Sequence, residues 1–228
     1  MAHILLLETS TTVCSVALSA DGEVVFERVS FENQSHAALS GVYVEEALAH
    51  ARAAGRAPEA VAVGRGPGSY TGLRIGASMA KGLCTGWGVP LIAVPTLAIM
   101  AAGAVRRLRD GDCLYCAMLD ARRMEVYATV YDCAGTPVRD VTAEIVTPQT
   151  CAGFLSRRRV CFFGSGAAKC RGVIDSPNAV FLDGVYPAAV DMAPLAEKAF
   201  RAQAFEDVAY FEPSYLKEFM ATTPKSRL

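Results

Sequence analysis

The stretch GRGPGSYTGLRIGASMAKGL, residues 64–83, combines residue types that could bind an anion. Its glycines allow a tight turn and close approach of the backbone to another group. Ser69 or Thr71 can cap a helix that begins here, and exposed N–H groups at a helix start suit a phosphate. The stretch lacks the GxxxxGK[ST] pattern of a P-loop. An anion-binding loop and a capped turn without a ligand therefore remain equally open interpretations.

The elements that position this loop follow from the alternation of apolar runs and turns. An Asp21-Gly22 turn joins two strands in a hairpin. The first half of the chain is predicted to contain strands at 3–8, 13–19 and 23–30, a helix at 34–52, a strand at 60–64, a helix at 70–86, a strand at 90–94 and a helix at 96–108.

The second half repeats this order in outline. Each half begins with a strand that ends in a carboxylate, Glu8 and Asp120, and each has a hairpin glycine 14 or 15 residues later, Gly22 and Gly135. After three strands from residue 113 we predict a helix near 148–158, a strand at 159–166, a short helix at 179–183 and a helix at 189–206. Repetition of this kind predicts two similar α/β lobes with a cleft between them, residues 1–108 and 109–228.

The helix after the glycine loop carries small residues at intervals of four, Gly72, Gly76 and Ala80. Each glycine costs about 1 kcal/mol of helix propensity relative to alanine. A helix packed closely against this stripe would compensate for that loss, and it could belong to the same lobe or to another subunit. The preceding helix, QSHAALSGVYVEEALAHA, is apolar on more faces than one sheet requires, which favours a second apolar contact.

Composition excludes several classes of protein. The net charge of −1 makes no case for independent binding of nucleic acid. No apolar segment is close to the length of about 20 residues that a membrane-spanning helix needs. The stretch MAHILLLETS lacks the basic region that precedes the apolar part of a leader peptide. We therefore expect a cytoplasmic protein without membrane contact. Most of the eight cysteines lie in apolar runs and are expected to be reduced core residues rather than a metal or redox site.

Four stretches together resemble the TsaB (YeaZ) family: LLLETSTTVCSVAL, GPGSYTGLRIGASMAKGL, PLIAVPTLAIMA and DARRMEVYATVY, with the ending FEPSYLKE. The resemblance spans most of the chain. It implies an actin-like, sugar-kinase and Hsp70-type (ASKHA) fold of two ribonuclease-H-like lobes. It also implies a non-catalytic subunit that supports TsaD, the enzyme that transfers threonylcarbamoyl to N6 of adenosine 37 of tRNA.

The resemblance further implies a TsaE-like ATPase as a second partner, a homodimer in some members, and contact with tRNA only through the complex. Together with the small-residue stripe it places the partner surface on two helices. The candidate residues are Ala38, Leu39, Val42, Tyr43 and Glu46 on the first helix and Gly72, Ile75, Gly76, Met79, Ala80 and Leu83 on the second.

Two enzyme classes of related fold, glycoproteases and kinases, are the alternatives to a non-catalytic subunit. TsaD-like relatives, long labelled glycoproteases, carry a metal-binding HxxxH, whereas His36 is followed by Ser40 here. His50 would lie about 21 Å from His36 along a helix, too far to share a metal. We therefore expect no metal site. A third alternative, a homodimer outside tRNA modification, is distinguished only by its partner.

Kinases of this fold place an acid followed by small residues at each of two phosphate loops. Glu8-Thr9-Ser10 fits that requirement loosely, but two arginines follow Asp120 where small residues are needed. We expect no required cofactor, and weak nucleotide binding stays open. The candidate nucleotide or anion residues are Glu8, Thr9, Ser10, Gly66, Gly68, Ser69 and Thr71.

Overall fold

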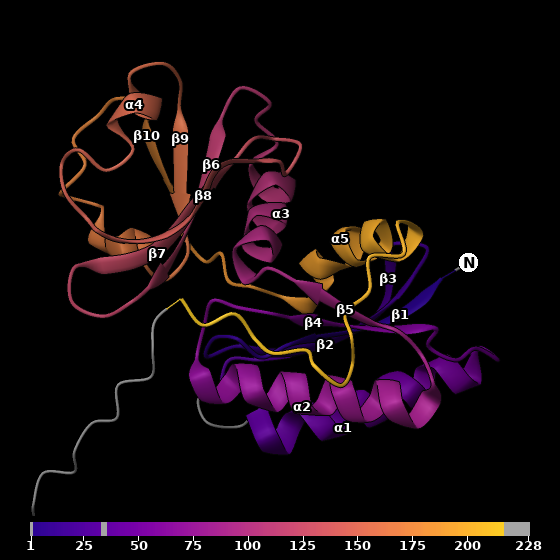
Figure 1. Ribbon diagram of the computed structural model, residues 1–228. Helices are drawn as coiled ribbons and strands as arrows, with labels where there is room; N and C mark the ends of the chain where they lie inside the picture. The colour runs from indigo at the N-terminus through magenta and orange to yellow at the C-terminus, as the bar shows by residue number, and fades with distance from the viewer. Residues whose placement is uncertain (1, 33–35, 217–228) are drawn as a thin grey trace, which may run out of the picture.

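Two five-stranded mixed sheets form the framework of the computed structural model, which describes residues 2–32 and 36–216 (Figure 1). The first sheet has the order β3-β2-β1-β4-β5, and the second has the order β8-β7-β6-β9-β10. In each sheet the first three strands are antiparallel neighbours, and the last two continue the sheet in parallel on the other side. The internal repeat in the sequence is therefore one topology used twice.

The first half of the chain forms the expected elements in the expected order. Asp21 and Gly22 have φ of 52° and 82°, the conformation that a two-residue hairpin turn requires. The elements are β1 (His3–Glu8), β2 (Cys14–Ala20), β3 (Glu23–Ser30), α1 (His36–Ala53), β4 (Ala60–Gly64), α2 (Tyr70–Trp87), β5 (Leu91–Val94) and α3 (Thr96–Leu108). The expected start of the first helix at 34–35 lies outside the described residues.

The second half differs from the expectation in three places. Its elements are β6 (Leu114–Asp120), β7 (Glu125–Tyr131), β8 (Pro137–Ile145), α4 (Ala152–Leu155), β9 (Val160–Phe163), the 3-10 helix η1 (Ala167–Lys169), β10 (Ala179–Leu182) and α5 (Ala189–Arg201). The short helix predicted at 179–183 is strand β10, because Ala179 pairs in parallel with Val160 of β9. The helix predicted near 148–158 shrinks to α4, and α5 ends before residue 206.

Helices α3 and α5 are exchanged between the two halves. Helix α3 comes from the first half, but its apolar face packs with β6 and β9 of the second sheet. Helix α5 comes from the second half, but Ala189, Met192, Ala193 and Ala196 pack with β1, β4 and β5 of the first sheet (Figure 1). The expected division at residue 108 therefore separates the strands of the two sheets but not the helices that cover them.

A polar contact joins the two exchanged helices. The Arg106 guanidinium donates to the Asp191 carboxylate over 2.7 and 3.1 Å, and Asp191 is buried. Gly103 lies against this carboxylate, where a Cβ would approach Oδ2 to 2.5 Å. Arg107 donates to the backbone carbonyls of Gly184 and Asp183, over 2.8 and 3.0 Å, and so holds α3 to the chain that leads into α5.

The other face of the first sheet is covered by α1 and α2, which lie side by side (Figure 1). The chain beyond α5 returns to this lobe. The Glu206 N–H donates to the Leu91 carbonyl of β5 over 2.9 Å, and Phe211 is buried with residues of α1 and α2. The tail therefore packs on the first lobe over residues 206–211.

Met192→Ala tests the assignment of α5 to the first lobe. Met192 is fully buried between α5 and the first sheet. Its truncation should lower the free energy of unfolding by about 2–5 kcal/mol. Lys198→Ala on the exposed side of the same helix is the control and should change it by less than about 0.5 kcal/mol. Urea unfolding followed by circular dichroism measures both, and an equally small effect of the two substitutions would contradict the packing.

Candidate functional site

The glycine loop between β4 and α2 packs directly on the loop that follows β1. The Ser69 N–H donates to the Ser10 carbonyl over 2.6 Å, and the Ser69 hydroxyl accepts from the Gly72 N–H over 3.3 Å as the helix cap. A Cβ at Gly68 would overlap the Ser10 carbonyl, and a Cβ at Gly72 would overlap the Thr9 carbonyl. The glycines are therefore required by close packing between two loops of the same lobe.

Glu8 is fully buried at the centre of this contact. Its Oε1 accepts from the Ser10 N–H over 2.6 Å, while its Oε2 lies against Gly64 without a hydrogen-bond partner among the described residues. Burial raises the pKa of the Glu8 carboxyl to about 7, and the hydrogen bonds from Ser10 and Thr9 only partly oppose that shift. At neutral pH this acid is therefore partly protonated and shielded from solvent.

The candidate anion residues are thus brought together around one turn, and a bound nucleotide stays a prediction. Glu8, Thr9, Ser10 and Gly66 are buried, Gly68 is half-buried, and Ser69 and Thr71 are exposed. Of this set, the exposed hydroxyls at the start of α2 are the groups that an external ligand could reach.

Asp120, the acid that corresponds to Glu8 in the second half, has a different environment. It is exposed, and its Oδ1 accepts from the Lys169 ammonium and from the Arg122 N–H, each over 2.6 Å. Burial raises the pKa of Asp120, but these hydrogen bonds outweigh that effect and lower it overall. The side chain is therefore ionised and already paired within its own lobe.

Helix α2 turns its small-residue stripe towards the sheet, which corrects the outward orientation assumed for the partner surface. Gly72, Gly76 and Ala80 are all buried. A Cβ at Gly76 would overlap the Thr9 hydroxyl and approach a Val63 methyl to 3.3 Å. The close neighbour that the stripe required is thus the lobe's own first sheet. Gly76→Arg would therefore disrupt the packing of α2 on the sheet.

The remaining predicted interface residues reach the surface. On α2 these are Ile75, Met79 and Leu83, which are half-buried. On α1, Ala38 and Val42 are exposed, and Leu39, Tyr43 and Glu46 are half-buried. Val42 has 49% of its surface exposed, a high fraction for a large apolar side chain on a helix. Glu46 is paired with Arg28 of β3 over 2.6 Å.

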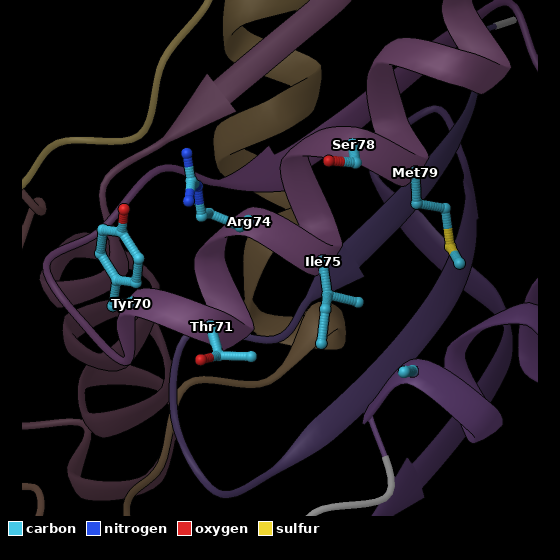
Figure 2. A pocket seen from close by; sticks show the side chains of 7 residues that line it. Tyr70, Thr71, Arg74, Ile75, Ser78 and Met79 are labelled. Carbon is cyan, nitrogen blue, oxygen red and sulfur yellow. The ribbon is translucent and has the colours of Figure 1, made fainter. Parts of the chain in front are cut away.

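A shallow groove of about 650 Å³ opens beside these residues. It is lined by Ala37, Tyr70, Thr71, Arg74, Ile75, Ser78 and Met79, and Figure 2 shows Tyr70 and Arg74 at one end and Met79 at the other. The residues predicted from the sequence do not include Ala37, Tyr70, Arg74 and Ser78. Three of them, Tyr70, Arg74 and Ser78, follow one another at intervals of four on α2. This spacing places them on one face of the helix, outside the glycine stripe.

Similarity to known proteins extends over both halves of the chain. A family model described as TsaD, tRNA N6-adenosine threonylcarbamoyltransferase, matches residues 30–224. The tRNA threonylcarbamoyladenosine biosynthesis protein TsaB of Escherichia coli is 34% identical over 227 residues, covering 96% of each chain. The chain belongs to the TsaB family. A TsaD relative from Nitratidesulfovibrio vulgaris, 36% identical, matches only 45% of the chain and 33% of its own length, so full-length similarity lies with TsaB.

Solved structures agree with this family. YeaZ from Pseudomonas aeruginosa superposes with a TM-score of 0.81 and 30% identity, covering 95% of this chain and all of that one. The activator of 2-hydroxyisocaproyl-CoA dehydratase from Clostridium difficile, at 11% identity and a TM-score of 0.50, shares the fold alone. The expected ASKHA-type fold of two lobes is confirmed.

Histidines and cysteines of this TsaB family member form no metal centre among residues 2–32 and 36–216. Ser40, four residues after His36 on α1, donates its hydroxyl proton to the His36 carbonyl over 2.5 Å. His50 packs its ring 5.7 Å from that of Phe26. All eight cysteines are unpaired, and seven are buried. No helix within the described ranges has the length and apolar character needed to cross a membrane.

Glu8→Gln should reduce the pH dependence of stability. The pKa of the Glu8 carboxyl is 4.5 in the unfolded chain, its ordinary value, and about 7 in the folded chain. Between these values the folded chain holds a proton that the unfolded chain has released, so the free energy of unfolding falls as pH rises. In the wild type this decrease in the free energy of unfolding amounts to about 3 kcal/mol, and it is complete above about pH 7. Melting temperatures at pH 5, 6, 7 and 8 measure it, and parallel profiles of wild type and variant would contradict it.

Proposed function

We propose that this TsaB family member is the non-catalytic partner of a TsaD-like subunit in the synthesis of threonylcarbamoyladenosine on tRNA. Similarity to TsaB over 96% of the chain, together with the match to the TsaD family model, supports a role beside a paralogous catalyst. The observation that carries the proposal is the apolar surface on α1 and α2. It presents Val42 and Ile75 at the surface of a helix pair whose inner face already has its core, and the half-buried Met79 packs partly against that core.

The polar groups that a catalyst of this fold would use support a non-catalytic role. Asp120 is held by Lys169, Glu8 is shielded from solvent, and Ser40 stands in place of a second metal-binding histidine. A kinase-like or glycoprotease-like enzyme is therefore the less favoured function. The proposal includes no required cofactor and leaves room for weak nucleotide binding near Ser69 and Thr71. Calorimetry with Mg-ATP tests this, and micromolar binding with turnover would contradict a scaffold.

The same surface supports the remaining partners that we propose. A homodimer would use α1 and α2 of two copies, and a TsaD-like subunit would replace one copy. A TsaE-like ATPase would join the pair, and tRNA would be held chiefly by the catalytic subunit, in agreement with the net charge of −1 of this chain. These roles go with a cytoplasmic location, where tRNA is modified.

Light scattering of the purified chain mixed with the TsaD-like protein of the same organism tests the pairing. We expect a species whose mass is the sum of the two chains. In a separate assay, omission of this chain should abolish tRNA modification by the TsaD-like protein. Persistence of two separate species, also in the presence of nucleotide and the ATPase, would overturn the proposed function.

Val42→Glu should abolish this complex without unfolding the lobe. Val42 is 49% exposed on α1, so the folded chain tolerates a charge there, whereas a partner surface would have to bury it unpaired. Val138→Glu on β8 of the second sheet, where the valine is 44% exposed, is the matched control. The control should bind as the wild type does in light scattering. Equal binding by both variants would move the partner surface away from α1.

A further inference from the structure

The C-terminal strap, residues 202–216 as far as the structure describes it, is fastened along the first lobe at several points. The Lys81 ammonium of α2 donates to the carbonyls of Ala209 and Phe211 over 3.0 and 3.2 Å. Together with the backbone pairing to β5, these contacts fix the course of the strap beside α2 (Figure 1). The strap is thus an ordered part of the lobe's surface up to the groove.

The end of the strap is fastened most tightly, next to the glycine loop. The Ser214 N–H donates to the Arg65 carbonyl over 2.7 Å, and the Arg65 side chain donates back to the Ser214 hydroxyl over 3.2 Å. Gly66, with φ of 106°, lies against the Ser214 carbonyl, where a Cβ would approach to 2.6 Å. Tyr215 therefore projects from a fixed backbone position.

Tyr215 is the first of three side chains in contact, and the third, Arg74, lines the groove. The Tyr215 ring centroid lies 5.1 Å from that of Tyr70, and the Arg74 guanidinium carbon lies 4.8 Å from the centroid of the Tyr70 ring. Figure 2 shows the guanidinium of Arg74 beside the Tyr70 ring at the same end of the groove. A cation held on an aromatic face has a defined direction that a free arginine side chain lacks.

Arg74 is also the charged side chain of the groove, and no carboxylate among the described residues forms an ion pair with it. Its neighbours Ile75 and Met79 supply an apolar floor. A complementary partner surface would therefore place an acidic side chain next to an apolar one. The groove is continuous with the exposed apolar residues of α1 and α2, which favours the catalytic partner as its occupant.

We infer that the strap is part of the partner-binding surface, with Tyr215 as a positioning residue that orients Tyr70 and Arg74 towards a carboxylate on the catalytic partner. This inference rests on the proposed function. It assigns to the strap a role in specificity, because the direction of the Arg74 guanidinium depends on a residue some 140 positions later in the chain. The partner would recognise α2 and the strap together.

The test is a double-mutant cycle on the affinity of the full chain for the TsaD-like subunit, measured by calorimetry at low and high salt. Arg74→Ala should weaken binding about tenfold and reduce its salt dependence. Tyr215→Ala should weaken binding about fivefold. The double variant should be no weaker than Arg74→Ala, because Tyr215 acts through Arg74.

Three further variants separate positioning from other effects. Tyr215→Phe keeps the ring and should bind as the wild type does, whereas Tyr215→Leu keeps an apolar side chain and should lose as much affinity as Tyr215→Ala. Tyr210→Ala is the matched control, since Tyr210 lies in the same strap, 84% exposed, with no ring contact among the described residues. Unchanged melting temperatures would show that the variants stay folded.

The outcomes distinguish this inference from the function on which it rests. Failure of the wild type to bind the catalytic subunit would overturn the proposed function. Normal wild-type binding with no loss in Tyr215→Ala would overturn only the role of the strap. Additive losses in the cycle would mean that Tyr215 acts independently of Arg74, which would also overturn the inference.

Discussion

The contact between the loop after β1 and the start of α2 is the constraint on which the arrangement of the first lobe depends. Backbone meets backbone there, with Ser69 donating to Ser10 and with Gly68 and Gly72 pressed against carbonyl oxygens. This approach sets both the position of α2 on the sheet and its rotation about its own axis. With Gly76 and Ala80 inside, Arg74, Ile75 and Met79 face outward or to the side. The groove is therefore a consequence of the glycine contact.

The two lobes are held together by the exchange of α3 and α5. Each sheet is covered on one face by a helix from the other half of the chain, so neither half can form a complete core by itself. The buried Asp191 and the arginine that pairs with it lie where these helices meet. This arrangement couples the two halves more closely than a linker between two domains would. It also explains why the strap after α5 is already close to the first lobe.

The corresponding ends of β1 and β6 place an acid in two different environments. Both strands end in an acid, Glu8 in β1 and Asp120 in β6. In the first half the acid is buried without a cation, and in the second it is paired with Lys169. Neither acid is left as a free carboxylate, while the outer side of α1 and α2 carries apolar side chains such as Val42 at the surface.

The amino-acid sequence by itself determined the order of the elements, the hairpin at Asp21-Gly22, the internal repeat and the family. Those features depend on local periodicity, turn residues and motif spacing, which are readable within a short window. Only the tertiary structure decided which sheet α3 and α5 cover, that 179–182 is a strand, and that the stripe at Gly72 and Gly76 faces inward. A stripe of small residues indicates that another group packs closely against the helix, but the stripe alone does not determine which group that is. That neighbour is supplied by residues distant in sequence, here Thr9 and Val63.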